Sequence, residues 1–180
     1  ALVMTRYTLV LDLDETLLKT RKNLKETDRN ETTIRPEIKS LLKWASKTFR
    51  LKILTKRSFD YARRMCILLD PNGKHLRKST AFEELIICKD DLKIINGEIV
   101  KDLNQLGLDS FETIVIDNDD KNWSDGKNLI NLNTIKKEKN PIEFFLSIRE
   151  AVWTKSVQLH QIKYCITIKR DVKPLSKLFR

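Results

Sequence analysis

The chain has 180 residues, a length that corresponds to a single domain. Its 41% hydrophobic and 33% charged residues are typical of a globular protein and exclude a disordered chain, while its 4 Gly and 4 Pro exclude collagen-like and low-complexity sequences. Lys and Arg total 35 against 25 Asp and Glu, so the net charge is +10. This excess indicates an anionic partner (nucleic acid, a phosphorylated protein or a phosphoester) unless it reflects only a Lys-rich composition.

The sequence contains no signs of a membrane protein or a secreted protein. No apolar run approaches the roughly 20 residues of a membrane-spanning helix, and the first residues lack the apolar segment of a secretory signal. Cys66, Cys88 and Cys165 are far apart, so they form neither a disulfide framework nor a zinc cluster. All three lie in apolar patterns and are expected to be buried thiols, which favours an intracellular, reducing compartment.

The first half of the chain alternates predicted strands with predicted helices. β-Branched and apolar runs predict strands over residues 7–11 and 49–54. Apolar residues spaced along one helical face predict helices that begin at Pro36 and after Ser58, which is a suitable N-cap. Residues 19–33 are polar with no apolar period, and we predict a loop there.

The second half continues the same alternation. Short apolar runs predict strands over residues 85–88, 113–116 and 129–132, and residues 100–106 are predicted as a short helix. The order favours an α/β fold of the Rossmann-like kind, with a central, mostly parallel sheet flanked by helices. Ligands of such sheets bind beyond the carboxyl ends of the strands. The residues at these ends are Asp12, Thr55 and Asp117.

The C-terminal part of the sequence is basic. A charged connector over residues 133–140 precedes a helix predicted for residues 141–156, and weak alternation predicts a last strand over residues 161–168. The side chains expected to face inward from the helix are Ile142, Phe145, Leu146, Val152 and Trp153. Residues 155–180 hold seven basic residues and one acidic residue, so this segment is a candidate for binding nucleic acid or for a purely structural capping role. With Met4 as a candidate initiator, we expect a core over residues 4–156 and a basic extension, packed on it or trailing it, over residues 157–180.

Two carboxylates follow the first strand at a spacing that suggests chemistry. Asp12 and Asp14 are two residues apart, and the repulsion between their carboxylates is unfavourable unless a cation or a function balances it. The alternative is that they only cap a turn. Apolar residues before and between them place the strand in the core and Asp12 at its tip. The pair is therefore a candidate for acid, base or nucleophilic roles.

Three further positions complete a possible site. Thr55 ends the second strand, and Asp117 with Asn118 ends another. Lys101 lies near a predicted helix start, where the helix dipole favours anions rather than a lysine. Thr55 alone would be an ordinary loop residue and Lys101 alone a solvated surface residue. Together with the first pair they supply a nucleophile, a hydroxyl donor, a cation and an acidic metal anchor.

Four segments match the motifs of one family, in its order: residues 11–17 (LDLDETL), 69–74 (LDPNGK), 100–106 (VKDLNQL), and 116–118 (IDN) with Trp123 and residues 128–130. They resemble the haloacid dehalogenase superfamily and, within it, the FCP/SCP-type phosphatases that act on the RNA polymerase II C-terminal domain. The resemblance covers roughly residues 6–150 and implies a Mg²⁺-dependent phosphatase with an aspartyl-phosphate intermediate.

The resemblance also implies a role for each matching residue. Asp12 would be the nucleophile, and Asp14 the general acid and then the base. The residues implied in binding the substrate phosphate are Thr55, Lys101 and Thr16, the last by fixing the loop. The residues implied in holding Mg²⁺ are Asp12, Asp14 through its backbone carbonyl, Asn118 and Asp117.

The substrate is less well indicated than the chemistry. The family usually carries a β-strand insert between its first two motifs, and here only the polar residues 19–33 occupy that interval, so the insert is expected to be reduced. A Ser/Thr phosphoprotein such as the polymerase tail would imply a nuclear location. A phosphatase for nucleic-acid phosphate ends or a small phosphoester, and a non-catalytic phosphoprotein-binding adaptor, remain alternatives. Lys56 and Arg57 either bind a second anionic group or belong to a solvated loop, and nothing indicates the oligomeric state.

Overall fold

The computed structural model describes residues 7–21, 31–78, 80–135 and 140–175. Five strands form one parallel sheet in the order β5-β4-β1-β8-β9. These strands are β1 (Thr8–Asp12), β4 (Arg50–Leu54), β5 (Ile86–Ile87), β8 (Thr113–Asp117) and β9 (Leu129–Asn131). The parallel sheet with its helices confirms the predicted α/β class.

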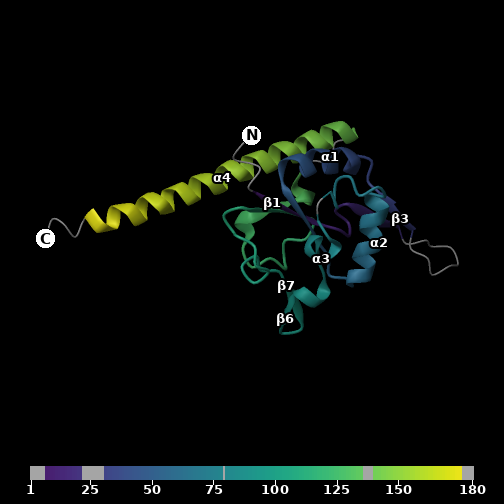
Figure 1. Ribbon diagram of the computed structural model, residues 1–180, viewed down its shortest axis with the longest axis horizontal. Coiled ribbons are helices and arrows are strands. Elements are labelled where there is room, and N and C mark those ends of the chain that lie inside the picture. Colours follow the sequence, from purple (N-terminus) through teal and green to yellow (C-terminus); the bar gives the residue numbers. More distant parts are fainter. Residues whose placement is uncertain (1–6, 22–30, 79, 136–139, 176–180) are drawn as a thin grey trace.

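Each face of the sheet has its own hydrophobic core, because successive residues of a strand point to opposite faces. One core joins Leu9 and Leu11 to α1 (Ile38–Thr48), α2 (Phe59–Leu69) and the first half of α4 (Pro141–Leu175), which cover the same face (Figure 1). The other core contains Val10, Leu103 and Trp123 and is covered mainly by irregular chain. The long helices therefore gather on one side of the sheet.

A first hairpin corrects the predicted loop over residues 19–33. Strand β2 (Leu18–Arg21) pairs antiparallel with β3 (Glu31–Ile34), so both ends of that interval are strands. Residues 22–30 lie outside the described residues. The alternation that forms this hairpin is carried by Thr and charged residues, which is why an apolar period does not reveal it.

A second hairpin corrects the predicted helix over residues 100–106. Strand β6 (Lys93–Ile95) pairs with β7 (Glu98–Val100) across Asn96 and Gly97, whose φ angles are +52° and +80°. An Asn-Gly pair favours such a turn because both residues tolerate positive φ. Val100 therefore ends a strand, and the chain continues into a turn over residues 103–107.

Two smaller differences concern predicted segments near β5 and β9. The one-turn helix α3 (Phe82–Leu85) occupies the first residue of the strand predicted over residues 85–88, which leaves only the two residues of β5. In the charged connector, a single 3-10 turn covers Leu132–Thr134. Residues 136–139 of that connector lie outside the described residues.

Helix α4 begins at Pro141 as predicted but continues to Leu175, so the predicted end near Ser156 and the predicted strand over residues 161–168 are wrong. The prediction of which side chains of this helix face inward is also partly wrong. Val152 is buried and Phe145 is partly buried, whereas Ile142, Leu146 and Trp153 are exposed. Over residues 141–167, where burial is described, the buried residues of α4 are Phe144, Ile148, Val152, Ser156 and Leu159. The helix has apolar side chains on two faces, so periodicity alone does not identify the buried one.

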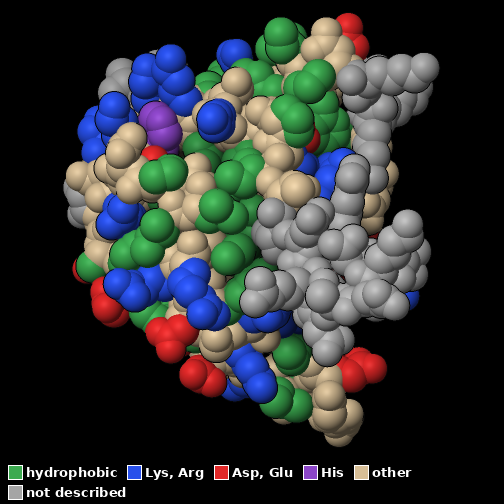
Figure 2. All heavy atoms as spheres, turned by 90° about the vertical axis from the view of Figure 1, so that its right-hand side faces the viewer, with side chains coloured by type: hydrophobic (Ala, Val, Ile, Leu, Met, Phe, Trp, Pro, Cys, Tyr) green, Lys and Arg blue, Asp and Glu red, His purple; other side chains and the backbone are tan. Residues whose placement is uncertain are grey.

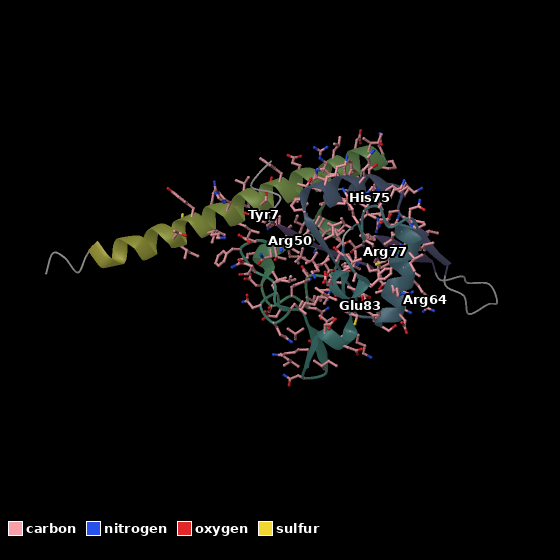
Figure 3. All side chains as sticks on the ribbon, viewed as in Figure 1. Tyr7, Arg50, Arg64, His75, Arg77 and Glu83 are labelled. Carbon is pink, nitrogen blue, oxygen red and sulfur yellow. The ribbon has the colours of Figure 1, made fainter. Side chains whose placement is uncertain are left out.

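Strand β1 holds α4 against the body through its preceding residue. The Tyr7 hydroxyl donates to the backbone carbonyl of Ser156 at 3.3 Å, and Figure 3 shows Tyr7 beside the helix. Up to residue 167, where burial is described, the buried residues of α4 all precede residue 160. Lys163 still reaches the body, where it donates to Glu112 at 2.7 Å, and toward its C-terminal end the helix projects from the molecule (Figure 1). The division into a core over residues 4–156 and an extension over residues 157–180 stays a prediction, although one continuous helix crosses it.

Exposed charge and buried sulfur complete the description. Figure 2 shows Lys and Arg side chains spread over the end of the molecule that α1 and α2 cover, so basic charge is not confined to residues 155–180. Cys66 and Cys88 are buried as predicted, but Cys165 is exposed because it lies on the projecting part of α4. Within the described part of the chain, no helix is both long and apolar enough to cross a membrane.

Candidate active site

The candidate residues meet at the carboxyl edge of the sheet. Strands β1, β4 and β8 run parallel and side by side, so the residues at their ends lie together. A hollow of about 360 Å³ opens there, lined by Asp12, Asp14, Lys56, Arg57, Lys101, Asp117, Asn118 and Asp119. Hollows of about 470 Å³ and 570 Å³ lie elsewhere, at the start of β4 and along α4, but neither is lined by a cluster of carboxylates.

Lys101 is the central cation of this hollow. Its side chain is 1% exposed, and its Nζ lies 2.5 Å from Oδ2 of Asp117 and 3.6 Å from Oδ1 of Asp12. The residue follows β7 and forms a bridge with Trp123 rather than starting a helix. A buried lysine is tolerated only when it is paired. Its position between two carboxylates explains why it is inside the protein.

Asp117 is held in place from three sides. Its Oδ2 accepts from Lys101 and from the indole N–H of Trp123 at 2.9 Å, and its Oδ1 accepts from the backbone N–H of Asp119 at 3.0 Å. It is fully buried at the end of β8. These bonds leave it little freedom to rotate, so it serves as a rigid anchor for Lys101.

Asp12 lies in an electrostatic environment that resists its ionisation. Burial, followed by the charge of Asp117, raises the pKa of Asp12 to about 8, against the opposing effects of Lys101 and a hydrogen bond from Thr16. The cluster has more carboxylates than lysines. Additional positive charge would therefore favour the ionised form of Asp12.

The loop after β1 has a conformation that turns its polar groups toward the hollow. Glu15 has a φ of +59°, and its carbonyl accepts from Arg35 Nη2 at 3.0 Å. The Thr16 hydroxyl donates back to Oδ2 of Asp12 at 3.2 Å. The structure thus agrees with a loop-fixing position for Thr16, although the expected role in phosphate binding stays a prediction.

Two hydroxyl groups donate hydrogen bonds to Asp14. The hydroxyl of Thr55 belongs to a residue predicted from the sequence, whereas that of Tyr61 does not. Tyr61 donates to Oδ1 of Asp14 at 2.5 Å, and Thr55 donates to Oδ2 at 3.3 Å. Burial and Asp14 raise the pKa of Tyr61 to about 12, so Tyr61 is a persistent donor. It lies in the first turn of α2, where its backbone N–H donates to the capping Ser58 hydroxyl at 3.2 Å. The signal that could have identified Tyr61 is a tyrosine in the first turn of a helix that starts at this sheet edge.

The two basic residues that follow β4, Lys56 and Arg57, already contact other side chains. Lys56 forms an ion pair with Asp119 at 3.3 Å, with both side chains more than a third exposed, and such pairs contribute about 0–1 kcal/mol. The Arg57 guanidinium lies 3.8 Å from the centre of the Tyr61 ring, and its backbone N–H donates to the Thr55 hydroxyl. Both cations line the hollow, but a weak surface pair and a stacked arginine do not by themselves identify an anion site.

Oxygen atoms suited to a hard cation converge beside Asp12. The Asn118 side-chain amide lies against Oδ2 of Asp12 and Oδ1 of Asp117, with separations of 3.3 and 3.2 Å. These contacts are satisfied if the amide nitrogen faces the carboxylates, or if the amide oxygen faces them across a cation. No group of three His, Cys, Asp or Glu side chains in the described ranges forms a metal cluster. Two carboxylates and an amide nevertheless fit the oxygen preference of Mg²⁺.

Comparisons with known proteins agree with this geometry. The family model described as NLI interacting factor-like phosphatase matches residues 7–158. The CTD small phosphatase-like protein 3 of Caenorhabditis elegans is 34% identical over 127 residues, which cover 62% of this chain and 41% of the relative. An RNA polymerase II C-terminal domain phosphatase of Encephalitozoon cuniculi is 29% identical over 133 residues, which cover 68% of this chain and 30% of the relative. The chain spans less than half the length of these relatives.

A solved structure shares the fold. The fission yeast RNA polymerase II CTD phosphatase Fcp1, in a form bound to beryllium fluoride, matches with a TM-score of 0.53 and 19% identity over 92% of this chain and 56% of that one. The match of the family model over most of the chain confirms the predicted family. The chain belongs to the NLI interacting factor-like phosphatases.

Proposed function

We propose that this member of the NLI interacting factor-like phosphatases is a phosphoric monoester hydrolase that removes phosphate from Ser or Thr in a protein. The observation that carries the proposal is the buried cluster of Asp12, Lys101 and Asp117 at the sheet edge, with Asp14 two residues from Asp12 and held by hydroxyls. A structural turn does not require a buried lysine between two acids. A phosphate-handling site does, because charge on the phosphoryl group must be neutralised.

The residues of the chain divide the reaction into two displacements. A carboxylate oxygen of Asp12 attacks phosphorus, forming an aspartyl-phosphate while the bond to the substrate oxygen breaks. Asp14 gives its proton to that leaving oxygen and then accepts a proton from the water that hydrolyses the intermediate. Lys101 and Thr55 hold the phosphoryl oxygens, and Tyr61 keeps Asp14 oriented.

The site favours a bound cation for this chemistry. Mg²⁺, when bound, supplies positive charge that favours the ionised form of Asp12 and offsets the charge of the phosphate. The residues proposed to hold it are Asp12 and Asn118 through side chains and Asp14 through its backbone carbonyl, with Asp117 beside them. The raised pKa of Asp12 supports the proposal, since this carboxylate is poorly ionised at neutral pH without such help.

The proposed substrate is a phosphopeptide like the RNA polymerase II C-terminal domain, which implies a nuclear location. Both curated relatives are named as CTD phosphatases or similar. The β2–β3 hairpin stands between the first two motifs, where the sequence suggested only a loop. The basic residues 155–180 and the reduced insert suggest a competing nucleic-acid substrate, yet α4 leads away from the body toward its C-terminal end (Figure 1). The phosphopeptide is therefore the better supported choice.

The decisive experiment compares Asp12→Asn with the native chain in hydrolysis of p-nitrophenyl phosphate and of phosphorylated heptad peptides. We expect Asp12→Asn to abolish both activities while Asp90→Asn, at an exposed position in the 3-10 turn Lys89–Asp91, leaves them unchanged. Undiminished turnover in Asp12→Asn would overturn the covalent mechanism. Faster turnover of a 3′-phosphate oligonucleotide would reassign the substrate, and absence of any turnover together with absence of Mg²⁺ binding would support the adaptor.

A further inference from the structure

Lys101 reaches the active-site hollow without the support of a central strand. Asp12, Thr55 and Asp117 lie at or just after the ends of β1, β4 and β8, which lie side by side in the central sheet. Lys101 instead follows β7, which pairs with β6 in a separate two-stranded sheet. A buried lysine that the central sheet does not fix needs another support, because its charge must stay paired inside the protein.

The loop that follows β8 supplies this support. The backbone N–H of Lys101 donates to the carbonyl of Asn122 at 2.7 Å. The carbonyl of Lys101 accepts from the backbone N–H of Ser124 at 3.0 Å and from the Ser124 hydroxyl at 3.3 Å. The loop therefore bonds to both backbone polar groups of the lysine. We call residues 119–124 the clasp.

The clasp is itself fixed at its first residue. The Asp119 backbone N–H donates to Oδ1 of Asp117 at 3.0 Å, which joins the clasp to the end of β8. The Asp119 carboxylate accepts from the backbone N–H of Lys121 at 3.0 Å and from the side-chain amide of Asn122 at 2.7 Å. These bonds lie within the protein, so the clasp does not depend on a ligand for its shape and can set the position of Lys101.

Trp123 connects the clasp to the side chain of Lys101. Its indole N–H donates at 2.9 Å to Oδ2 of Asp117, the same oxygen that lies 2.5 Å from Nζ of Lys101. Nζ also lies 5.4 Å from the centre of the Trp123 ring, within the range of a cation–π contact. Trp123 is not among the residues that line the hollow, so any effect it has on the reaction passes through Lys101 and Asp117.

Packing alone does not account for the contact between Trp123 and Asp117. Trp123 belongs to the second hydrophobic core, and a buried indole N–H needs an acceptor, but a backbone carbonyl would satisfy it. The acceptor here is a carboxylate oxygen that already binds a buried lysine, so the indole and Lys101 compete for its charge. This competition weakens the hold of Asp117 on Lys101 and lets Nζ stay within 3.6 Å of Asp12.

We propose that the clasp positions Lys101 for the phosphoryl group and that Trp123 is its positioning residue, acting through Asp117. The inference rests on the phosphatase function proposed above. Without the indole N–H, Oδ2 of Asp117 interacts with Lys101 alone, and Nζ is drawn away from Asp12, where the phosphoryl group binds. The charge that develops on the phosphoryl oxygens during transfer is then less well neutralised.

An isostere of tryptophan separates the indole N–H from the packing of the ring. In benzothienylalanine a sulfur atom replaces the N–H, while the two fused rings keep nearly the same size. We expect Trp123→benzothienylalanine to lower kcat for p-nitrophenyl phosphate, in the presence of Mg²⁺, by about tenfold to a hundredfold, because a hydrogen bond to a charged group is lost. The matched control is the same replacement at Trp153, which is 53% exposed and should leave kcat unchanged.

Urea unfolding distinguishes positioning from packing in the same variants. If Trp123 only packs in the core, the isostere can lower the urea midpoint but leaves the kcat of the folded enzyme as it was, and this result would overturn the proposal. A second variant, Asp119→Ala, loosens the clasp at a partly exposed position and should also lower kcat severalfold. Its control is Asp90→Ala, which removes a carboxylate from the exposed turn Lys89–Asp91. Equal effects of these two changes would contradict a role for the clasp.

A crystal structure of Trp123→benzothienylalanine follows Lys101 without relying on catalysis. We expect Nζ of Lys101 to move beyond about 4 Å from Oδ1 of Asp12, the limit of an ion pair, and to remain beside Asp117. If the native chain hydrolyses no phosphate ester but Nζ moves in this way, the phosphatase proposal fails and the clasp stands. If the native chain is active and the isostere leaves Nζ in place, Trp123 does not act through Lys101 and the clasp proposal alone is overturned.

Discussion

The carboxyl edge of the sheet and helix α4 depart from ordinary burial in opposite ways. At the sheet edge, Asp12, Lys101 and Asp117 are charged groups held inside the protein. On α4, Trp153 and Tyr164 are large apolar groups left outside. Burying charge and exposing apolar surface both cost stability, so each departure indicates a role that stability alone does not explain. The first points to chemistry, and the second marks a surface that packing within a single chain does not explain.

The strongest test of the sheet edge is to remove its cation. We expect Lys101→Met to lower the free energy of unfolding by about 3–5 kcal/mol, because the buried carboxylate of Asp117 loses its counter-charge. Phosphatase activity should be lost as well. Urea unfolding followed by turnover assays would measure both effects. The control is Lys127→Met, which removes an exposed ion pair with Asp125 and should change stability by about 0–1 kcal/mol; equal effects of the two changes would contradict a special role for the buried lysine.

A milder substitution at the same edge tests whether Tyr61 orients Asp14 or binds the substrate. Tyr61→Phe removes the hydroxyl that donates to Asp14 and keeps the ring that Arg57 covers. We expect kcat to fall about tenfold to a hundredfold, within the range that general acid–base catalysis contributes, with little change in KM. Steady-state kinetics on p-nitrophenyl phosphate would measure the two constants, and Tyr164→Phe on α4 is the matched control. A higher KM at unchanged kcat would mean that Tyr61 contacts the substrate instead.

The same substitution, Val to Ala, can compare a buried position and an exposed position of α4. Val152→Ala removes buried methyl groups and should lower the free energy of unfolding by about 1–3 kcal/mol through lost packing. Val157→Ala, at a partly exposed site, should cost less than about 0.5 kcal/mol in the monomer. Denaturant unfolding at low protein concentration measures both values. Equal losses would show that Val157 is also packed within a single chain.

The last prediction concerns the charge of Asp12 itself and its dependence on pH. Its pKa rises from 3.8 to about 8 on folding, so between these pH values the native state keeps a proton that the unfolded state releases. Asp12 therefore lowers stability progressively as the pH rises through this window. In cation-free buffer, Asp12→Asn should be more stable than the native chain at pH 8 and nearly equal to it near pH 4.

Thermal unfolding across this pH range, with and without Mg²⁺, checks the prediction. Added Mg²⁺ should reduce the advantage of Asp12→Asn at pH 8 by favouring the ionised carboxylate of the native chain. An advantage of the variant that is the same at pH 4 and pH 8 would show that burial does not hold the proton on Asp12. The exposed Asp90→Asn is again the control.

Several elements could be read from the sequence because their signals are local. Apolar runs that end in Asp12 and Asp117 mark the tips of buried strands, and Ser58 marks the start of α2. The hairpin across Asn96 and Gly97 has an equally local signal, the Asn-Gly turn, in a segment for which no element is predicted above. The hairpin β2–β3 had no such signal within the described residues, since its pairing joins polar residues across residues 22–30.

The amino-acid sequence alone was enough to predict the α/β class, the family and the positions of Asp12, Asp14, Thr55, Lys101, Asp117 and Asn118, because these depend on short motifs and on where apolar runs stop. The folded chain was needed to show that Tyr61 reaches Asp14, that Lys101 is buried between two acids, and which face of α4 meets the sheet. The physical reason is that these features join segments far apart in the chain. A helix with apolar residues on two sides has no intrinsic inner face until the rest of the protein packs against one of them.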